Sequence, residues 1–309
     1  MALTLLEANK LNDGDVKKSA IIEMFAANSD LLRVMPFEDV PGGSLSYTKE
    51  GKLPGVAFRG FNESYTGSEG VMNPEVEVLR IAGGELDVDK AIIKTRGEQA
   101  RTTQEAMKVK AMALAISAKM INGDSEVNPR EFDGLRKRIV GYQLVPANLT
   151  APAANSPLTL EALDEAIDRV DGATHLIMSK TMRNKLSSAA RNGVGGDMDF
   201  TLDEFGQRVA IYNGLPILIV DYDQDGAKII DFNEAGPGAG TSSQSIYIVS
   251  IGSNKVTGLQ NGSMDVKDLG EIDAAPVYRT RVEWLVGMAI MHGRAAARIW
   301  GITNGAVTG

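Results

Sequence analysis

The chain has 309 residues, of which 43% are hydrophobic and 23% charged, the composition of an ordinary soluble globular protein. It contains no cysteine, and this excludes disulfides, thiolate metal sites and cysteine nucleophiles. The formal charge of −8 argues against a protein that binds nucleic acid with its whole surface, and no apolar run approaches the ~18 residues of a membrane helix.

The first forty residues predict one amphipathic helix and one short strand. The start, MALTLLEANKLNDGD, lacks the basic region and apolar block of a secretion signal, so we expect synthesis and folding in the cytoplasm. The helix is expected over residues 15–27, because one stripe is formed by Val16, Ala20, Ile21, Met24 and Phe25. LLRVMPF, at residues 31–37, predicts the strand.

Residues 43–67 predict a hairpin that cannot stabilise itself. Apolar residues alternate with polar ones on both sides of a turn cluster at residues 50–55. An isolated two-stranded hairpin is marginal in water, and the glycines raise the entropic cost of ordering it. We therefore expect another chain to cover it, through the contact residues Leu45, Tyr47, Val56, Phe58 and Phe61. The return limb, residues 74–94, predicts a second extended ribbon.

A long helix is predicted from Glu98 to Ile121, because this stretch has neither Gly nor Pro and ends at Asn122-Gly123. Its length would be roughly 36 Å, well beyond the average helix. Thr103, Met107, Ala111, Leu114, Ala118 and Ile121 recur at spacings of three or four. We expect this stripe to face the core, with Met107, Leu114 and Ile121 as its main apolar groups.

The best internal boundary is the Pro-, Ala- and Asn-rich stretch PANLTAPAANSP at residues 146–157. Short helices and strands alternate after it, which predicts an α/β block around a mostly buried sheet. After residue 270 the sequence predicts long strands that rejoin the first half of the chain. The predicted fold class is therefore α+β, without internal repeats.

One motif resembles half of a calcium-binding loop. Asp221, Asp223, Asp225 and Gly226 match D-x-D-x-D-G, but Phe232 stands where the loop requires a bidentate Glu. The flanking segments predict strands, whereas a calcium hand has helices on both sides. We therefore expect a tight acidic turn and no metal.

The remaining polar motifs do not predict enzyme chemistry. Two glycine-rich segments lack the spacing of phosphate-binding loops, and no G-x-S-x-G elbow occurs. His175 and His292 are far apart, so packing or hydrogen bonding is the better interpretation. Asp87 and Asp89 predict a solvated strand face, and the basic residues 136–138 predict a solvated or ion-paired surface. No catalytic group and no cofactor is expected.

The order of these parts resembles the major capsid protein of tailed bacteriophages, which has the Hong Kong 97-like fold. The resemblance covers essentially the whole chain and is carried by the polar hairpin, the long helix with NPREFDGL soon after it, TLEALDEAID, NGLPILIVDYD and the final long strands. It implies an N-terminal arm at 1–40, an extended E-loop at 41–90, a peripheral domain at 91–145 and 271–309, and an axial domain at 146–270. Residues 98–121 would be the spine helix of the peripheral domain.

The resemblance implies a structural protein that assembles with itself into hexamers and pentamers of an icosahedral head shell. The shell would enclose double-stranded DNA, contacted non-specifically, and would form in the host cytoplasm, with scaffold, portal and decoration proteins as further partners. Some members cross-link an E-loop lysine to a neighbouring asparagine. Lys49 and Lys52 lie at suitable places, but no acceptor can be matched, so we do not expect a cross-link.

Two alternatives stay open from the sequence. An encapsulin, a bacterial shell protein that packages a cargo enzyme, has the same architecture, and the contents of the particle would distinguish it from a phage capsid. A cytosolic α/β enzyme with an unrecognised site belongs to another class. Size separates this alternative, because a shell has megadalton mass whereas an enzyme forms a small oligomer.

Overall fold

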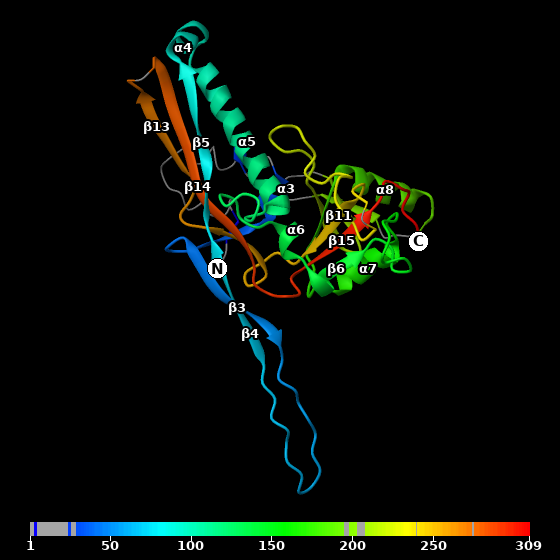
Figure 1. Cartoon of the computed structure of the whole chain (residues 1–309). Helices are drawn as coiled ribbons and strands as arrows, with labels where there is room; N and C mark the ends of the chain where they lie inside the picture. Colours follow the sequence, from blue (N-terminus) through cyan, green and yellow to red (C-terminus); the bar gives the residue numbers. More distant parts are fainter. Residues whose placement is uncertain are drawn as a thin grey trace.

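A computed structural model describes residues 3–4, 24–25, 29–194, 198–202, 208–238, 240–273 and 275–309. Three sheets and one long helix dominate it: a body of long strands backed by the helix, an α/β block beside it, and a two-stranded hairpin that projects away from both (Figure 1). Most of the predicted helix at 15–27 lies outside the described residues. Of that range only Met24 and Phe25 are described, and both are helical.

The long-strand sheet has the order β1-β2-β12-β14-β13, and β5 also pairs with β14. Its strands are β1 (Leu3–Thr4), β2 (Pro36–Asp39), β5 (Arg80–Asp89), β12 (Val256–Gln260), β13 (Asp265–Glu271) and β14 (Val277–Ile290). β5 and β14 pair antiparallel along their length, from Val277 opposite Asp89 to Val286 opposite Arg80. This ribbon joins the two halves of the sequence, as the return of long strands after residue 270 predicts.

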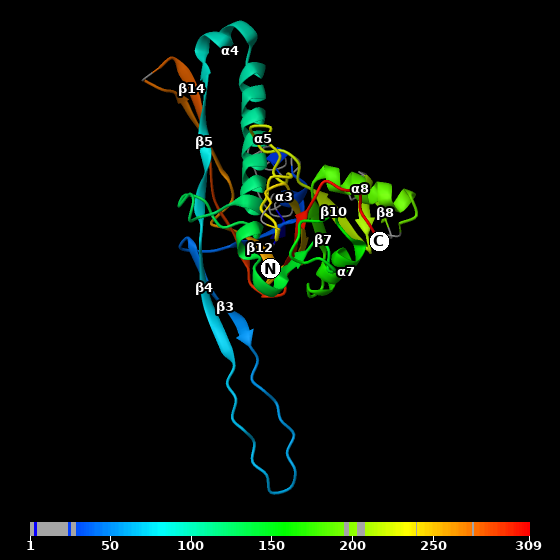
Figure 2. The ribbon, with the colours of Figure 1, turned by 45° about the vertical axis from the view of Figure 1, so that its right-hand side comes forward.

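The spine helix α5 (Gln99–Asn122) lies along β5 and follows the short helix α4 (Lys90–Arg96), as Figure 2 shows. Its end is shaped by two glycines. A Cβ on Gly123 would lie 2.3 Å from the Phe132 carbonyl oxygen, and one on Gly134 would lie 2.6 Å from the Ile121 carbonyl oxygen. These positions therefore let the loop through residues 124–134 return close against the helix end, where α6 (Leu135–Arg138) begins.

The α/β block is built on a seven-stranded sheet of order β6-β15-β11-β7-β10-β9-β8. Its strands are β6 (Leu144–Pro146), β7 (His175–Met178), β8 (Met198–Leu202), β9 (Arg208–Tyr212), β10 (Leu215–Ile219), β11 (Gln244–Val249) and β15 (Ala296–Ile302), with α7 (Leu160–Asp168), α8 (Lys180–Arg191) and the 3-10 helix η1 (Gly141–Gln143). β11 is buried at every position, which agrees with the expected buried sheet. Ser179 and Thr159 cap α8 and α7 through their hydroxyls.

Strand pairing differs from the expected division of the chain in two respects. β15, expected with the long strands, pairs with β11 and β6 of the α/β block, whereas β12 and β13, expected in the block, lie beside β14. The chain crosses between the two sheets at both of these places. A division drawn from contiguous stretches of sequence misses such crossings, because the sequence of a single strand does not say with which sheet it pairs.

The predicted strand over LLRVMPF is wrong in its first half. Residues 30–34 form helix α3 (Asp30–Val34), and only the residues from Pro36 are extended. Ser29 caps the helix, because its hydroxyl accepts a hydrogen bond from the Leu32 amide at 3.4 Å. A serine followed by an acidic residue in the first turn is a signal of a helix start.

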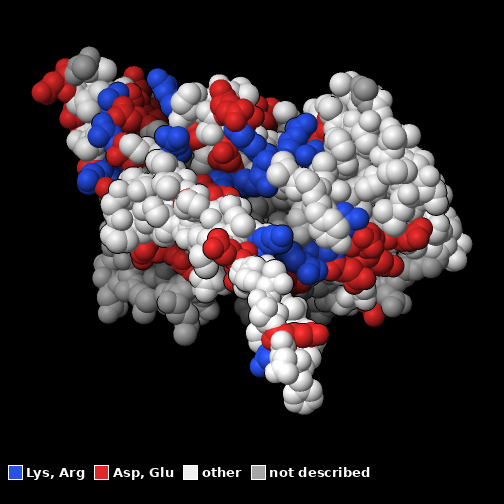
Figure 3. Space-filling view, turned by 60° about the horizontal axis from the view of Figure 1, so that its bottom comes forward, with Lys and Arg blue, Asp and Glu red and all other residues white. Residues whose placement is uncertain are grey.

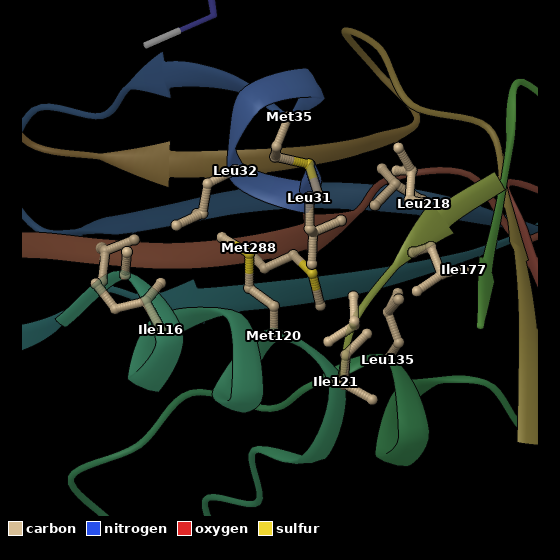
Figure 4. Close-up of a cluster of buried hydrophobic side chains, with 14 of the residues drawn as sticks. Leu31, Leu32, Met35, Ile116, Met120, Ile121, Leu135, Ile177, Leu218 and Met288 are labelled. Atoms are coloured by element: carbon tan, nitrogen blue, oxygen red, sulfur yellow. The ribbon is translucent and has the colours of Figure 1, made fainter. Parts of the chain in front are cut away.

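One core lies where α3, α5, α6 and the two sheets meet (Figure 4). Leu31, Leu32 and Met35 approach from the α3 segment, opposite Ile116, Met120 and Ile121 of α5. Trp284 belongs to the same core, with the ring of Phe25 edge-on at 5.4 Å between centroids and that of Phe37 at 4.9 Å. Burial of these large apolar groups accounts for much of the stability of the body.

The expected core face of α5 is wrong except at its last residue. Ile121 is buried, but Met107 is 60% exposed and Leu114 is half-buried. The residues that face the core are Val109, Met112, Ala113, Ile116, Ser117, Met120 and Ile121. The error arises because α5 carries Ala, Met or Leu on several sides, so that more than one apolar stripe fits the 3.6-residue period.

Candidate assembly surfaces

The hairpin is formed by β3 (Ser44–Lys52) and β4 (Val71–Val78), which pair from Ser44 opposite Val78 to Lys52 opposite Val71. A bulge interrupts the register between Glu50 and Lys52. Residues 53–70 form the tip, and all of them are exposed. We call residues 44–50 with 72–78 the foot of the hairpin and residues 53–70 the tip.

The inner face of the foot packs on the body of its own chain. Leu45 and Tyr47 lie against a small cluster that includes Val40, Leu79 and Leu259. This corrects the expectation that both residues are left for another chain. Their odd positions put them on the face of β3 that is turned toward the body, whereas the even positions carry Ser and Thr.

Hydrogen bonds and ion pairs fix the foot. The Tyr47 hydroxyl lies 3.1 Å from Glu75 Oε2, 3.1 Å from Glu77 Oε1 and 3.3 Å from the Ile290 carbonyl oxygen. Burial and the charges of Glu77 and Glu75 raise the pKa of Tyr47, so the hydroxyl stays a neutral donor. Lys49 Nζ lies 2.6 Å from Glu75 Oε2 on the same face.

Arg138, at the end of α6, connects the foot to the spine. Its guanidinium binds the Glu77 carboxylate with both terminal nitrogens, and Nη2 lies 2.6 Å from Glu77 Oε2. Burial lowers the pKa of Arg138, but the hydrogen bond and charge of Glu77 outweigh it and the pKa is raised. The sequence did not predict this pair. Its only signals in the sequence were a basic residue in the run at 136–138 and an acid in PEVEV, which do not say that the two side chains meet.

The neighbouring residue Lys137 is also ion-paired. Its Nζ lies 2.6 Å from Asp124 Oδ1 and 3.3 Å from carboxylate oxygens of Glu126 and Asp133. The hydrogen bond to Asp124 is the largest cause that raises the pKa of Lys137. The basic run at 136–138 was expected to be a solvated or ion-paired surface; Lys137 and Arg138 are both ion-paired, and Arg138 is largely buried.

The outer face of the foot is exposed and largely apolar or uncharged. Met72, Val76 and Val78 lie on it, and their partners across the ribbon are Glu50, Ser46 and Ser44. Apart from Glu50 this face carries no charge. A row of exposed apolar groups on a ribbon with free edges is typical of an interaction surface.

The large side chains of the tip are all exposed, three of them almost completely. Val56, Phe58 and Phe61 have exposed fractions of 89%, 101% and 103%, so none of them contacts its own chain appreciably. Local contacts give the tip some order: the Gly60 amide donates to Glu63 Oε2 at 2.8 Å, and Arg59 lies over the Tyr65 ring at 5.3 Å. Lys52 is exposed beside the tip, whereas Lys49 is held by Glu75.

The face from which the hairpin projects is rich in charge. Figure 3 shows Lys and Arg side chains where the hairpin meets the body, with Asp and Glu beside them, on the hairpin and further along the same face. Along β5 and β14 opposite charges pair directly: Arg279 binds Asp87 at 2.7 Å and Arg281 binds Glu85 at 2.5 Å. Asp87 is therefore exposed on the strand face, as expected, and is also ion-paired there with Arg279.

Polar groups in the α/β block have structural contacts. The carboxylate of buried Glu234 binds Arg298 at 2.8 Å and accepts a hydrogen bond from Ser245 at 2.5 Å. Burial lowers the pKa of His175 to about 4, and its Nδ1 lies 2.9 Å from Thr174 Oγ1. Asp223 Oδ1 accepts the amides of Asp225 and Ala227 at 2.9 Å, which closes the acidic turn.

The described residues lack two features that would point to other functions. They contain no group of three or more His, Cys, Asp or Glu side chains arranged to hold a metal ion. Within the same residues, no helix combines the length and apolar character needed to span a membrane. The most prominent exposed features of the described residues are the hairpin tip, the outer face of its foot and the ion-paired surface of β5 and β14.

Comparison with known proteins gives one family match. The family model described as major capsid protein GP7 matches residues 13–156, the part of the chain that contains the hairpin and the spine helix. No curated protein matches the sequence.

Solved structures match over nearly the whole chain. An encapsulin from Synechococcus elongatus PCC 7942 has a TM-score of 0.63 at 16% identity and covers 98% of this chain and 97% of its own. The capsid of a native GTA particle has a TM-score of 0.59 at 14% identity, covering 88% and 90%. A chain of Mycobacterium phage Bobi has a TM-score of 0.59 at 10% identity, covering 90% and 91%. At these identities the likeness shows a shared fold.

Proposed function

We propose that this chain is a major capsid protein with the Hong Kong 97-like fold, the repeating subunit of an icosahedral phage head. The observation that carries the proposal is the family match over residues 13–156, because it covers the hairpin and the spine helix together. The family and the fold are those of shell proteins and not of enzymes. The function then lies in surfaces that contact other copies.

The exposed hairpin supports this function physically. Three large apolar side chains at the tip, and three more on the outer face of the foot, are exposed in the single chain. Exposed apolar groups gathered on a projecting element indicate a protein contact. A hairpin that reaches beyond its own body can cover a neighbour, and repetition of one such head-to-tail contact closes a ring. Pentamers and hexamers are rings of this kind.

The parts of the chain take corresponding roles in the proposal. Residues 1–40 are the arm, which adds β1 and β2 to the long-strand sheet. The E-loop, expected at 41–90, is reduced to residues 41–78, because β5 pairs with β14 in the same sheet. The long-strand sheet with α5 is the peripheral domain, and the α/β block with β15 is the axial domain. The shell would assemble in the host cytoplasm and enclose double-stranded DNA, contacted non-specifically. Scaffold, portal and decoration proteins are proposed as further partners.

An encapsulin shell is the second candidate, since the encapsulin has the highest TM-score of the structures described above. The fold does not separate the two shells, and the family match favours the phage capsid. Their contents separate them. Particles purified after co-expression with a phage packaging system are expected to hold nuclease-protected DNA, whereas a particle that retains one host or co-encoded enzyme and no DNA would favour the encapsulin.

Mass measurement tests the shell itself. We expect particles of megadalton mass by light scattering, with closed outlines by negative-stain microscopy. Only monomers or dimers under every assembly condition, including co-expression with the cognate scaffold, would contradict the proposal.

A further inference from the structure

One helical segment of this acidic chain is basic. Residues 90–122, which contain α4 and α5, carry seven Lys or Arg residues and two Glu residues, a local charge of +5 in a chain with a net charge of −8. From Ala106 to Asn122 there are three lysines and no acid. The acidic excess of the chain therefore lies entirely outside this segment, and a local cluster of this kind attracts anions although the whole chain repels them.

A cleft between the start of β5 and α5, with a volume of about 280 Å³, gathers part of this charge. Four cations from three parts of the chain line it, with Glu131 as the one acid: Arg80 of β5, Lys108 and Lys119 of α5, and Arg130 of the loop after α5. The side chains between them are mostly small or apolar, such as Ala82, Ala111 and Ala115. The lining of the cleft therefore has a net charge of +3.

Three of the four cations have no anionic partner. Lys119 binds Glu131 at 2.9 Å, but among the described residues no carboxylate lies within ion-pair distance of Arg80, Lys108 or Arg130. Arg80 Nε is buried and also lacks a hydrogen-bond partner. A buried donor without an acceptor is unfavourable, so the cleft favours an incoming anion.

The end of the Lys108 side chain lies against the backbone of β5 at Gly84. A Cβ on Gly84 would lie 2.6 Å from Lys108 Nζ and 2.8 Å from Lys108 Cε. A side chain at residue 84 would therefore displace the ammonium group. This accounts for one of the two adjacent glycines in RIAGGELD, and it keeps a positive charge against the strand.

The length of the cluster indicates which anion fits. Lys108 and Lys119 line the same cleft from positions eleven residues apart on α5, which is about 16 Å along the helix axis. One carboxylate or one free phosphate is too small to contact both ends of such a row. Each strand of duplex DNA carries a phosphate every 3.4 Å or so along its axis, so a row of phosphates matches the length.

The residue types also fit phosphate. Arginine and lysine are the side chains that neutralise the DNA backbone, and arginine can bind two phosphate oxygens at once. Arg80 and Arg130 approach the cleft from the strand and from the loop, on either side of the lysines of α5 in the sequence. The small side chains between the cations leave them accessible from solvent.

We propose that the cleft between β5 and α5 binds the phosphate backbone of double-stranded DNA, with Arg80, Lys108 and Arg130 as the cations that neutralise it. This rests on the proposed shell function and names the place where packaged DNA would contact the subunit. Contacts to phosphate carry no sequence information, so duplexes of different sequence should bind equally well. The cleft would then open toward the inside of the shell.

DNA binding by the full-length subunit before assembly tests the site. Fluorescence anisotropy of a short labelled duplex gives the affinity over a range of salt concentrations. Each phosphate that is neutralised contributes about 0.9 to the slope of log affinity against log salt, so three cations predict a slope of roughly three. The double variant Lys108→Gln, Arg130→Gln should bind at least about tenfold more weakly at low salt, with the slope reduced by about two.

The matched control removes two positive charges elsewhere. Lys228 and Arg294 are exposed and lie outside the cleft, where they pair with Asp231 at 3.6 Å and with Asp171 at 3.3 Å. The double variant Lys228→Gln, Arg294→Gln has the same net charge as the cleft variant and should keep the wild-type affinity and slope. Circular dichroism establishes that both variants fold.

Three results would overturn the proposal. Equal loss of affinity in the two variants would mean that only the net charge matters. An unchanged slope in the cleft variant would mean that these cations do not meet phosphate. A peptide of alternating Glu and Phe that binds the wild type and not the cleft variant, when no duplex binds, would assign the cleft to a protein partner.

Assembly separates this inference from the shell proposal. The cleft variant should form closed particles as the wild type does, because the cations meet DNA and not another copy. A cleft variant that binds DNA normally and fails to close would assign the cations to a contact between copies and overturn the site. Closed particles from a wild-type subunit that binds no DNA would overturn the site and leave the shell intact. DNA binding through the cleft by subunits that never close would support the site and contradict the shell.

Discussion

At the scale of single residues, the foot of the hairpin depends on Glu77 and Arg138. Both side chains are largely buried, and each provides the charge that compensates the other. Removing one member of such a pair leaves a buried charge without a partner, which is costly. Removing both members eliminates the attraction and the uncompensated buried charge together, so the cost is smaller. The pair also connects the hairpin to α6, so its energetics decide how firmly the hairpin is held.

We predict that Arg138→Ala destabilises the free subunit by about 2–4 kcal/mol. The double variant Glu77→Ala, Arg138→Ala should be clearly more stable than the sum of the two single changes implies. Urea unfolding of the four proteins in the cycle measures this coupling. Strictly additive effects would show that the two groups do not interact in solution.

His175 gives a prediction about pH. Burial lowers its pKa to about 4, below the ordinary value of 6.5, so the folded state binds fewer protons than the unfolded state between these values. Stability from this group is therefore complete above pH 6.5 and is lost as the pH falls toward 4. The loss should be roughly 2–3 kcal/mol, after allowance for partial exposure.

The measurement compares unfolding free energies of wild type and His175→Gln at pH 7 and pH 4.5. The difference between the two proteins should change across this range, because only the wild type gains a proton at residue 175 on unfolding. His292→Gln, at the only other histidine, is the matched control. A constant difference for His175→Gln would mean that the imidazole is not shielded from solvent.

At the scale of elements, α5 shows both the strength and the limit of the sequence pattern. Its bounds, Gln99–Asn122, agree closely with the predicted Glu98 to Ile121, since the absence of Gly and Pro and the terminal Asn-Gly are local signals. Its buried face was misassigned, because the choice between two apolar stripes is made by the elements that pack on the helix. Those contacts come from β5, α3 and α6 and leave no mark in the helix sequence itself.

Paired substitutions in α5 test the corrected face. Met120→Asp places a carboxylate in the core at a fully buried position and should cost more than about 4 kcal/mol, with loss of the folded subunit. Met107→Asp, at a position 60% exposed, should leave the melting temperature of the free subunit nearly unchanged. Leu114→Asp should lie between them. Comparable loss of folding in Met107→Asp would show that the stripe first predicted, with Met107 facing the core, is the correct one.

The hairpin shows the same division between local and long-range information. Alternation and turn residues predicted the ribbon and its exposed tip, and Val56, Phe58 and Phe61 are exposed as expected. Leu45 and Tyr47 pack on their own chain instead, because β12 and the end of β14 happen to lie beneath the foot. The ion pair between Glu77 and Arg138 is likewise set by packing across distant segments.

At the scale of the whole molecule, the fold is a body with a long projecting element, and this shape has a physical consequence. An element without cover in the single chain gains its order only when another surface covers it. The foot is already fixed by its own contacts, so the change on assembly should be confined to the tip. The proposed function therefore predicts that the effect of assembly on backbone order changes sharply between the foot and the tip of the hairpin.

Hydrogen exchange measured in free subunits and in assembled particles tests this claim most directly. Backbone amides of residues 53–70 should exchange rapidly in the subunit and slowly in the particle, whereas those amides of residues 44–50 and 75–78 that donate hydrogen bonds between β3 and β4 should be protected in both. Equal exchange of the tip in the two states would contradict the account, because the exposed residues that we assign to the contact would then remain uncovered in the shell.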